Sequence, residues 1–244
     1  SIDWHLVSGR RLSEGPIGTA DVVVVAVSDG AISQCAERLA IWLQTGSCVL
    51  HCAGARGPDE LAVCRDAGAH VGVMHPLVSF ADADHPPSLR GATFVTAGDV
   101  PAIEAAQHLA RVLGARILVA PIHGPVYHAL IALVANGAVG LVHAAVPILQ
   151  RLGLERREAE QSIAGLLRTV VENVDQLGVP KALTGPIARG DAASIAAHRG
   201  ALQRAAPDAA AAYDAIVPLM LRCAIDGGMS AKHAAEIREA LGRE

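Results

Sequence analysis

The sequence has 244 residues, which is enough for one large domain or two small ones and for a sizeable buried core. Its net charge of −4 and pI of about 6.2 give no electrostatic reason to expect nucleic acid or an anionic membrane as a partner. Hydrophobic residues make up 52% of the chain and aromatic residues only 2%, so the core must consist of Ala, Val, Leu and Ile. Such cores favour closely packed helices and parallel strands.

The number and spacing of the cysteines indicate the cellular compartment of the protein. There are five of them, an odd number, and none forms a CxxC pair, which argues against a disulfide framework and against a structural zinc site. The N-terminal residues contain no apolar signal segment. We therefore expect reduced thiols, no metal site and a cytoplasmic location.

The first half of the chain alternates between strand and helix patterns. A β-branched run at 20–27 ends in Ser-Asp-Gly and enters a helical pattern at 32–44. Further strands are expected at 47–52, 70–76, 92–98 and 116–121, and further helices at 60–69 and 100–115. Strands that alternate with helices of this length predict βαβ units and a mostly parallel sheet.

The pattern changes after residue 121. The remainder reads as helices only: a long apolar one from 123 to 150, an amphipathic one closed by Gly178, and three more after a break at 179–191. The sequence therefore predicts an α/β domain over residues 1–121, followed by an all-α domain over residues 122–244.

The long apolar helix lies in a run without Asp, Glu, Lys or Arg from 117 to 150. By length alone it could span a membrane, since about 18 apolar residues suffice. However, it also carries Asn136 and several histidines, and such groups are costly in hydrocarbon. We expect no membrane, and a helix that packs in the all-α domain with one end facing a cleft.

Three loops follow predicted strands, at 26–31, 51–56 and 74–80. Each contains small or polar residues, and ligands of open α/β sheets bind at the carboxyl ends of the strands. Any one loop could be explained by the needs of a turn. Three successive strand ends of this kind in one sheet favour a binding site.

Two further groups are candidates for chemistry. His128 and Asn136 lie on one face of the long helix, where the histidine could donate a proton at neutral pH or both could simply be satisfied in a packed interface. The segment "LTGPIARGD" at 183–191 falls in the break between helices. Its Asp191 is a good N-cap, which alone would explain its presence.

Taken together and in order, these motifs over residues 20–202 resemble the Rossmann-like proteins that carry a DUF2520 C-terminal domain. That family is grouped with NAD(P)-dependent oxidoreductases of the 6-phosphogluconate dehydrogenase-like superfamily, alongside ketopantoate and pyrroline-5-carboxylate reductases. The resemblance implies a nucleotide-binding sheet, a helical domain that forms a homodimer, and an active cleft between the two domains. The expected fold is a truncated Rossmann-like parallel sheet followed by an all-α domain.

The resemblance also implies roles for single residues. Two strand-end segments would border the nicotinamide of NADP or NAD: Ala26, Val27, Ser28 and Asp29, and Cys52, Ala53 and Gly54. Residues expected to contact the substrate are His75, Pro76, Thr184, Arg189 and Asp191. His128 and Asn136 would be catalytic, although related reductases place a lysine and an asparagine on this helix, and here the helix has no lysine.

One feature of the family is absent, since no GxGxxG turn occurs in these 244 residues. Either the turn lies outside this sequence or this member has lost it. Arg10 and Arg11 would suit the 2′-phosphate of NADP, or they are ordinary surface arginines. The predicted function is an NAD(P)H-dependent reductase of a small 2-oxo acid or cyclic imine. The alternative is a non-catalytic homodimer that binds a metabolite.

Overall fold

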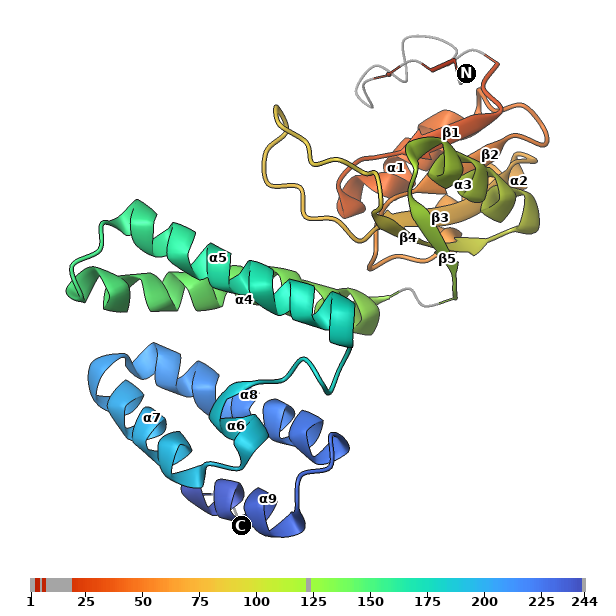
Figure 1. The fold of residues 1–244 in the computed structure, drawn as a ribbon. Helices are drawn as coiled ribbons and strands as arrows, with labels where there is room; N and C mark the ends of the chain where they lie inside the picture. The colour runs from red at the N-terminus through yellow and green to blue at the C-terminus, as the bar shows by residue number, and fades with distance from the viewer. Residues whose placement is uncertain (1–2, 5, 8–18, 122–123, 243–244) are drawn as a thin grey trace. The chain divides into compact units, whose positions relative to one another are not determined.

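The β-branched runs of the first half form one five-stranded sheet, in the order β1-β2-β3-β4-β5. The computed structural model describes residues 3–4, 6–7, 19–121 and 124–242 (Figure 1). Arg10 and Arg11 lie outside the described residues. The strands are β1 (Val22–Val25), β2 (Cys48–His51), β3 (His70–Pro76), β4 (Thr93–Gly98) and β5 (Arg116–Val119).

The strands run in two directions. β1, β2 and β3 are parallel, β4 is antiparallel to β3, and β5 is parallel to β4. The reversal occurs at residues 77–92, which contain no helix, and a chain that lacks a crossover returns as an antiparallel neighbour. The predicted parallel sheet is therefore confirmed for the first three strands. Their carboxyl ends share one edge of the sheet.

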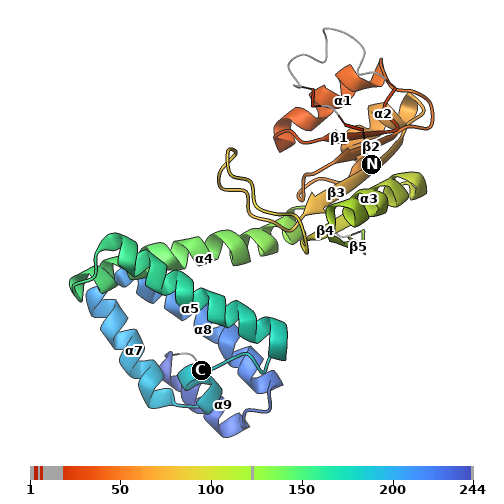
Figure 2. The same ribbon diagram turned by 45° about the horizontal axis from the view of Figure 1, so that its top comes forward.

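Helices cover both faces of the sheet (Figure 2). On one face, α3 (Val100–Leu113) packs Ala102, Ala106 and Ala110 against a cluster that includes Leu50 and Met74. The other face is covered by α1 (Ile32–Ala40), η3 (Pro58–Leu61) and α2 (Ala62–Asp66). Alternate residues of β2 point to opposite faces, and all four are buried: Val49 and Leu50 are apolar, whereas the strand ends in the buried His51.

After β5 the described residues form helices only. These are α4 (Pro125–Arg151), α5 (Arg156–Leu177), α6 (Gly185–Arg189), α7 (Ala192–Ala205), α8 (Pro207–Asp226) and α9 (Ala231–Ala240). Helices α6 to α9 share one core, built around Ile187, Ile195, Val217, Leu221 and Ile237. This core is separate from the two cores of the sheet.

The chain divides by its contacts into two units, Ser1–Ala135 and Asn136–Glu244. The sequence-based boundary between residues 121 and 122 marks the end of the strands, whereas the division by contacts falls inside α4. The first turns of α4 belong to the α/β unit because they are hydrogen-bonded to it, through Gly124 N–H to the Gly54 carbonyl and between Tyr127 and His75.

Helix α4 is apolar and largely exposed. Val146 is its one buried residue among those described, while Val126 and Val134 are 76% and 75% exposed. It is also long and apolar enough to cross a membrane, a property that core helices of soluble proteins share. The close packing expected for this helix in the all-α domain is therefore not found along most of its described length.

Candidate functional site

The carboxyl ends of β1, β2 and β3 place three loops on one edge of the sheet. The first loop follows β1. Its Ser28 carbonyl accepts a hydrogen bond from Ala31 N–H (2.8 Å), which closes the tight turn η2 (Asp29–Ala31). Ala26, Ser28 and Asp29 are exposed and Val27 is half-buried, so this loop presents small side chains and one carboxylate.

The second loop follows β2 and is shaped by His51. The His51 imidazole is fully buried; its Nε2 donates to the Gly57 carbonyl (2.9 Å) and its Nδ1 accepts from Ala53 N–H (3.2 Å). Both bonds require the neutral ring with its proton on Nε2. Burial lowers the pKa of His51, in agreement with that assignment.

Sequence reasoning named this loop but not His51 as the residue that holds it. The available signal was a histidine at the last position of an otherwise apolar strand. The buried ring fixes the backbone on which Cys52, Ala53 and Gly54 lie.

Cys52 is unsuited to nucleophilic chemistry. Burial raises the pKa of its thiol to about 11, so the thiol stays protonated at neutral pH. Ala53 and Gly54 beside it are buried. These three residues therefore offer a compact, uncharged surface.

His75, near the end of β3, lies against Gly54. A Cβ atom on residue 54 would come within 2.6 Å of His75 Nε2, so the glycine allows the ring to lie directly against the loop. The backbone of the β2 loop and the ring from β3 are thus in direct contact. Pro76 is the next residue and ends the strand.

The first turn of α4 completes this cluster. Gly124 donates its N–H to the Gly54 carbonyl (3.3 Å) and accepts from His128 N–H (3.1 Å) through its own carbonyl. The Tyr127 hydroxyl lies 3.0 Å from His75 Nδ1, with the two rings edge to face at 5.6 Å between centroids. The ring of His128 lies 6.1 Å from that of His75.

The structure therefore brings together Gly54, His75 and His128, which the sequence had named, and adds Tyr127. Burial raises the pKa of Tyr127, so its phenol keeps its proton across the neutral range. The helical stripe that selected His128 and Asn136 does not include position 127. For that reason pattern reasoning passed over the tyrosine.

Asn136 is not part of this cluster. It is exposed and lies eight residues beyond His128 on α4, roughly 12 Å along the helix axis. By contacts it belongs to the second unit.

Thr184, Arg189 and Asp191 form a tight corner in the second unit. Thr184 precedes α6 as its N-cap, and the exposed Arg189 ends that helix. The Asp191 carboxylate caps α7 by accepting from Ser194 N–H (3.0 Å) and the Ser194 hydroxyl (2.6 Å). Gly190 between them has a left-handed φ of 73°, and a Cβ there would meet the His233 ring at 2.8 Å. The segment is thus accounted for by local folding, and its predicted contact with substrate stays a prediction.

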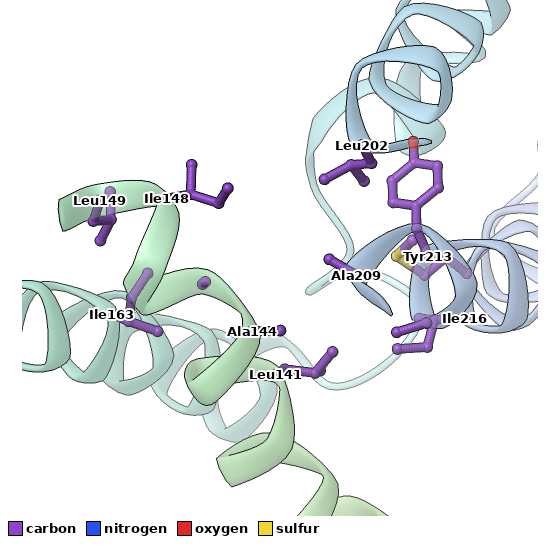
Figure 3. Close-up of a pocket in the computed structure, with 12 residues that line it drawn as sticks. Leu141, Ala144, Ile148, Leu149, Ile163, Leu202, Ala209, Tyr213 and Ile216 are labelled. Carbon is purple, nitrogen blue, oxygen red and sulfur yellow. The ribbon is translucent and has the colours of Figure 1, made fainter. Parts of the chain in front are cut away.

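A cavity of about 350 Å³ lies between α4, α5, α7 and α8 within the second unit. Figure 3 shows Leu141 and Leu149 on one side and Leu202 and Tyr213 on the other. Its lining is aliphatic apart from Tyr213 and Met220 and contains no charged side chain. It is therefore a poor site for a small carboxylate. In the described part of the chain, no group of three or more His, Cys, Asp or Glu residues could hold a metal ion.

Comparison with known proteins gives a family for this chain. The family described as "Domain of unknown function (DUF2520)" matches residues 92–218, just over half of the sequence. No curated protein matches the chain significantly.

Solved structures share its fold. Protein TM1727 from Thermotoga maritima is 24% identical with a TM-score of 0.70, over 86% of this chain and 81% of that one. The "putative NADP oxidoreductase BF3122" from Bacteroides fragilis is 18% identical with a TM-score of 0.65, over 86% and 78%. Pyrroline carboxylate reductase from Plasmodium falciparum, solved with NADP bound, is 10% identical with a TM-score of 0.54, over 89% and 77%. At these identities the likeness shows a common Rossmann-like fold with a helical second part.

Replacing Gly54 by alanine should displace the His75 ring and break its bond to Tyr127, because the new Cβ would occupy the place of Nε2. Since the ring is the end of a movable side chain, we expect a stability loss of at most about 2 kcal/mol. NMR of the histidine ring nitrogens should show the His75 Nδ1 signal shifted. Gly57→Ala, where nothing lies within 4 Å of the added Cβ, is the matched control. An unshifted His75 signal in the Gly54 variant would contradict the geometry.

His51 should make stability depend on pH. Its pKa is lowered in the folded protein, so the unfolded chain binds the proton more readily below its ordinary pKa of about 6.5. The contribution of His51 to the free energy of unfolding, measured in urea, should therefore be complete above that pH. It should decrease as the pH drops below that value. The limiting slope is about 1.4 kcal/mol per pH unit.

His51→Gln should reduce this slope, whereas His108→Gln, at an exposed position of α3, should retain it. An identical slope in the His51 variant and the wild type would show that another group is responsible.

Proposed function

The chain belongs to the DUF2520 family, and on that premise we propose that it is a nicotinamide-dependent reductase of a small 2-oxo acid or cyclic imine. The observation that carries the proposal is the hydrogen-bonded pair of His75 and Tyr127, with His128 beside it, at the carboxyl edge of β1–β3. Reduction of a carbonyl or imine needs a proton donor, and both imidazole and phenol can serve.

The residues around Gly54 fit the nicotinamide half of such a cofactor. The loop at 52–54 is small and uncharged, and its Gly54 lies directly against the His75 ring. The exposed residues Ala26 and Ser28 lie in the neighbouring loop on the same edge. When bound, a reduced nicotinamide would supply the hydride.

The phosphate half of the cofactor does not find a comparable fit. No GxGxxG turn occurs in the sequence, and the first loop carries the carboxylate of Asp29, which repels phosphate. The fit within the described residues is therefore to the nicotinamide ring and not to the pyrophosphate. The same fold carries NADP in the Plasmodium reductase, so a nicotinamide cofactor is the first to test.

The chain's own residues would handle the proton and the substrate. His75 and Tyr127 hold an exchangeable proton between them, and the ring of His128, which the sequence proposed as the donor, lies beside the pair. Arg189 would pair with a substrate carboxylate and Asn136 would orient the substrate; both remain predictions from the sequence.

We expect calorimetry with the full chain to detect binding of NADPH or NADH, weakened by the lack of a GxGxxG turn in this sequence. Mixing the protein with either cofactor and a panel of 2-oxo acids and cyclic imines should then consume the reduced nicotinamide. Absence of binding for both cofactors would contradict the proposal. If a panel member bound without turnover, the non-catalytic metabolite-binding function would be favoured.

We also propose that a second copy of the chain covers helix α4. The large side chains Leu130, Leu133 and Val134 lie on one face of α4 and are 59–75% exposed, and we call this the apolar face. Exposed patches of this kind usually mark an interface. Because the helix has no Asp, Glu or Lys, the apolar face of one copy can meet that of another without repulsion about a two-fold axis. A cytoplasmic location stays a prediction from the sequence.

Sedimentation should show a dimer at micromolar concentration without detergent. Val134→Asp should weaken the dimer at least about tenfold, because the interface would bury a charge. Val112→Asp on α3, also an exposed valine, should leave it intact. A monomeric wild type, or a wild type extractable only with detergent, would contradict the dimer.

A further inference from the structure

We infer that Tyr127, not the neighbouring His128, delivers the proton to the substrate, and that His75 acts as a positioning residue that returns a proton to Tyr127. The inference rests on the proposed function and goes further, because it assigns the donor among the titratable side chains of the cluster.

The contacts separate the two candidates. The Tyr127 hydroxyl is held 3.0 Å from His75 Nδ1, so its oxygen has a fixed direction and a fixed partner. His128 is exposed, and among the described residues no hydrogen bond orients its imidazole. General acids owe much of their effect to fixed orientation, and a freely rotating ring lacks that advantage.

The position of His75 explains how Tyr127 could be used repeatedly. Its Nε2 side is pressed against Gly54, and its Nδ1 side meets the tyrosine oxygen. One side of the ring therefore contacts the loop, and the other side contacts Tyr127. A substrate that reaches the tyrosine oxygen would contact a hydroxyl that is hydrogen-bonded to the His75 imidazole. The imidazole could then supply the tyrosine with another proton.

When bound, a reduced nicotinamide would supply a hydride to the substrate's carbonyl or imine carbon, and the Tyr127 hydroxyl would give its proton to the substrate's oxygen or nitrogen. The Tyr127 oxygen takes the Nδ1 proton of a protonated His75, which becomes neutral and recovers a proton from water. The products are the hydroxy acid or amine and the oxidised nicotinamide.

The neutral phenol suits this role. A tyrosine is protonated at neutral pH, and burial raises the pKa of Tyr127 further, so release of its proton depends on the His75 imidazole, which can hydrogen-bond to the phenolate that forms. His128 stays next to the pair and contributes a second imidazole edge without being the donor.

Three variants test the assignment in the full chain. Tyr127→Phe keeps the ring but removes the hydroxyl, and it should lower kcat by about 10²–10⁴-fold while KM and NADPH affinity change less than about threefold. His128→Gln should lower kcat less than about fivefold on the same scale. His75→Asn keeps a hydrogen-bonding group near the Nδ1 position but cannot hold a proton, so it should lose kcat with little change in KM.

A second readout does not depend on turnover. In the cofactor-free protein, the Nδ1 resonance of His75 should shift in Tyr127→Phe and stay in place in His128→Gln. A wild type active on the panel with kcat lost in His128→Gln and kept in Tyr127→Phe would overturn the assignment and leave the reductase function standing. A wild type inactive with every cofactor and substrate would overturn both.

Discussion

The contact of the His75 ring with Gly54 is the constraint on which the site depends. It requires a glycine in the loop after β2, and it fixes the imidazole so that Nδ1 faces the first turn of α4. The same glycine accepts the hydrogen bond from Gly124 through its carbonyl, which holds that turn in place. The loop itself keeps its shape because the buried His51 bonds to its backbone at both ends. Strands β2 and β3, the loop after β2 and the first turn of α4 thus meet at Gly54.

The electrostatic character of this edge follows from burial. His51 is held neutral, Cys52 remains a thiol and Tyr127 remains a phenol, because desolvation disfavours each charged form. Such a site can exchange a proton. In the part of the chain that the structure describes it contains no glycine-rich anion-binding turn, and Asp29 lies in the adjacent loop. The apolar cavity of the second unit has a different character and is lined mostly by aliphatic groups.

Most of the elements could be predicted from periodicity, including the buried strands and the helices after residue 121. The direction of β4 could not, because it depends on residues 77–92 forming no crossover helix. Tyr127 and His51 were missed because their roles arise from contacts between distant segments, which no local pattern records. Asp191 was predicted as an N-cap, and the structure confirms that bond to Ser194. The length and apolarity of α4 were evident in the sequence, but its exposure was not, since exposure depends on contacts with segments distant in the sequence.

The most direct measurement is a crystal structure of the protein with NADPH and an unreactive carboxylate-bearing analogue of a 2-oxo acid. The account predicts that the analogue's polar atom at the reacting position lies about 3 Å from the Tyr127 hydroxyl, with His75 Nδ1 still bonded to that hydroxyl. The nicotinamide ring should lie over the loop at Cys52, Ala53 and Gly54. An analogue bound at His128 with Tyr127 turned away, or bound in the apolar cavity between α4 and α8, would contradict the account.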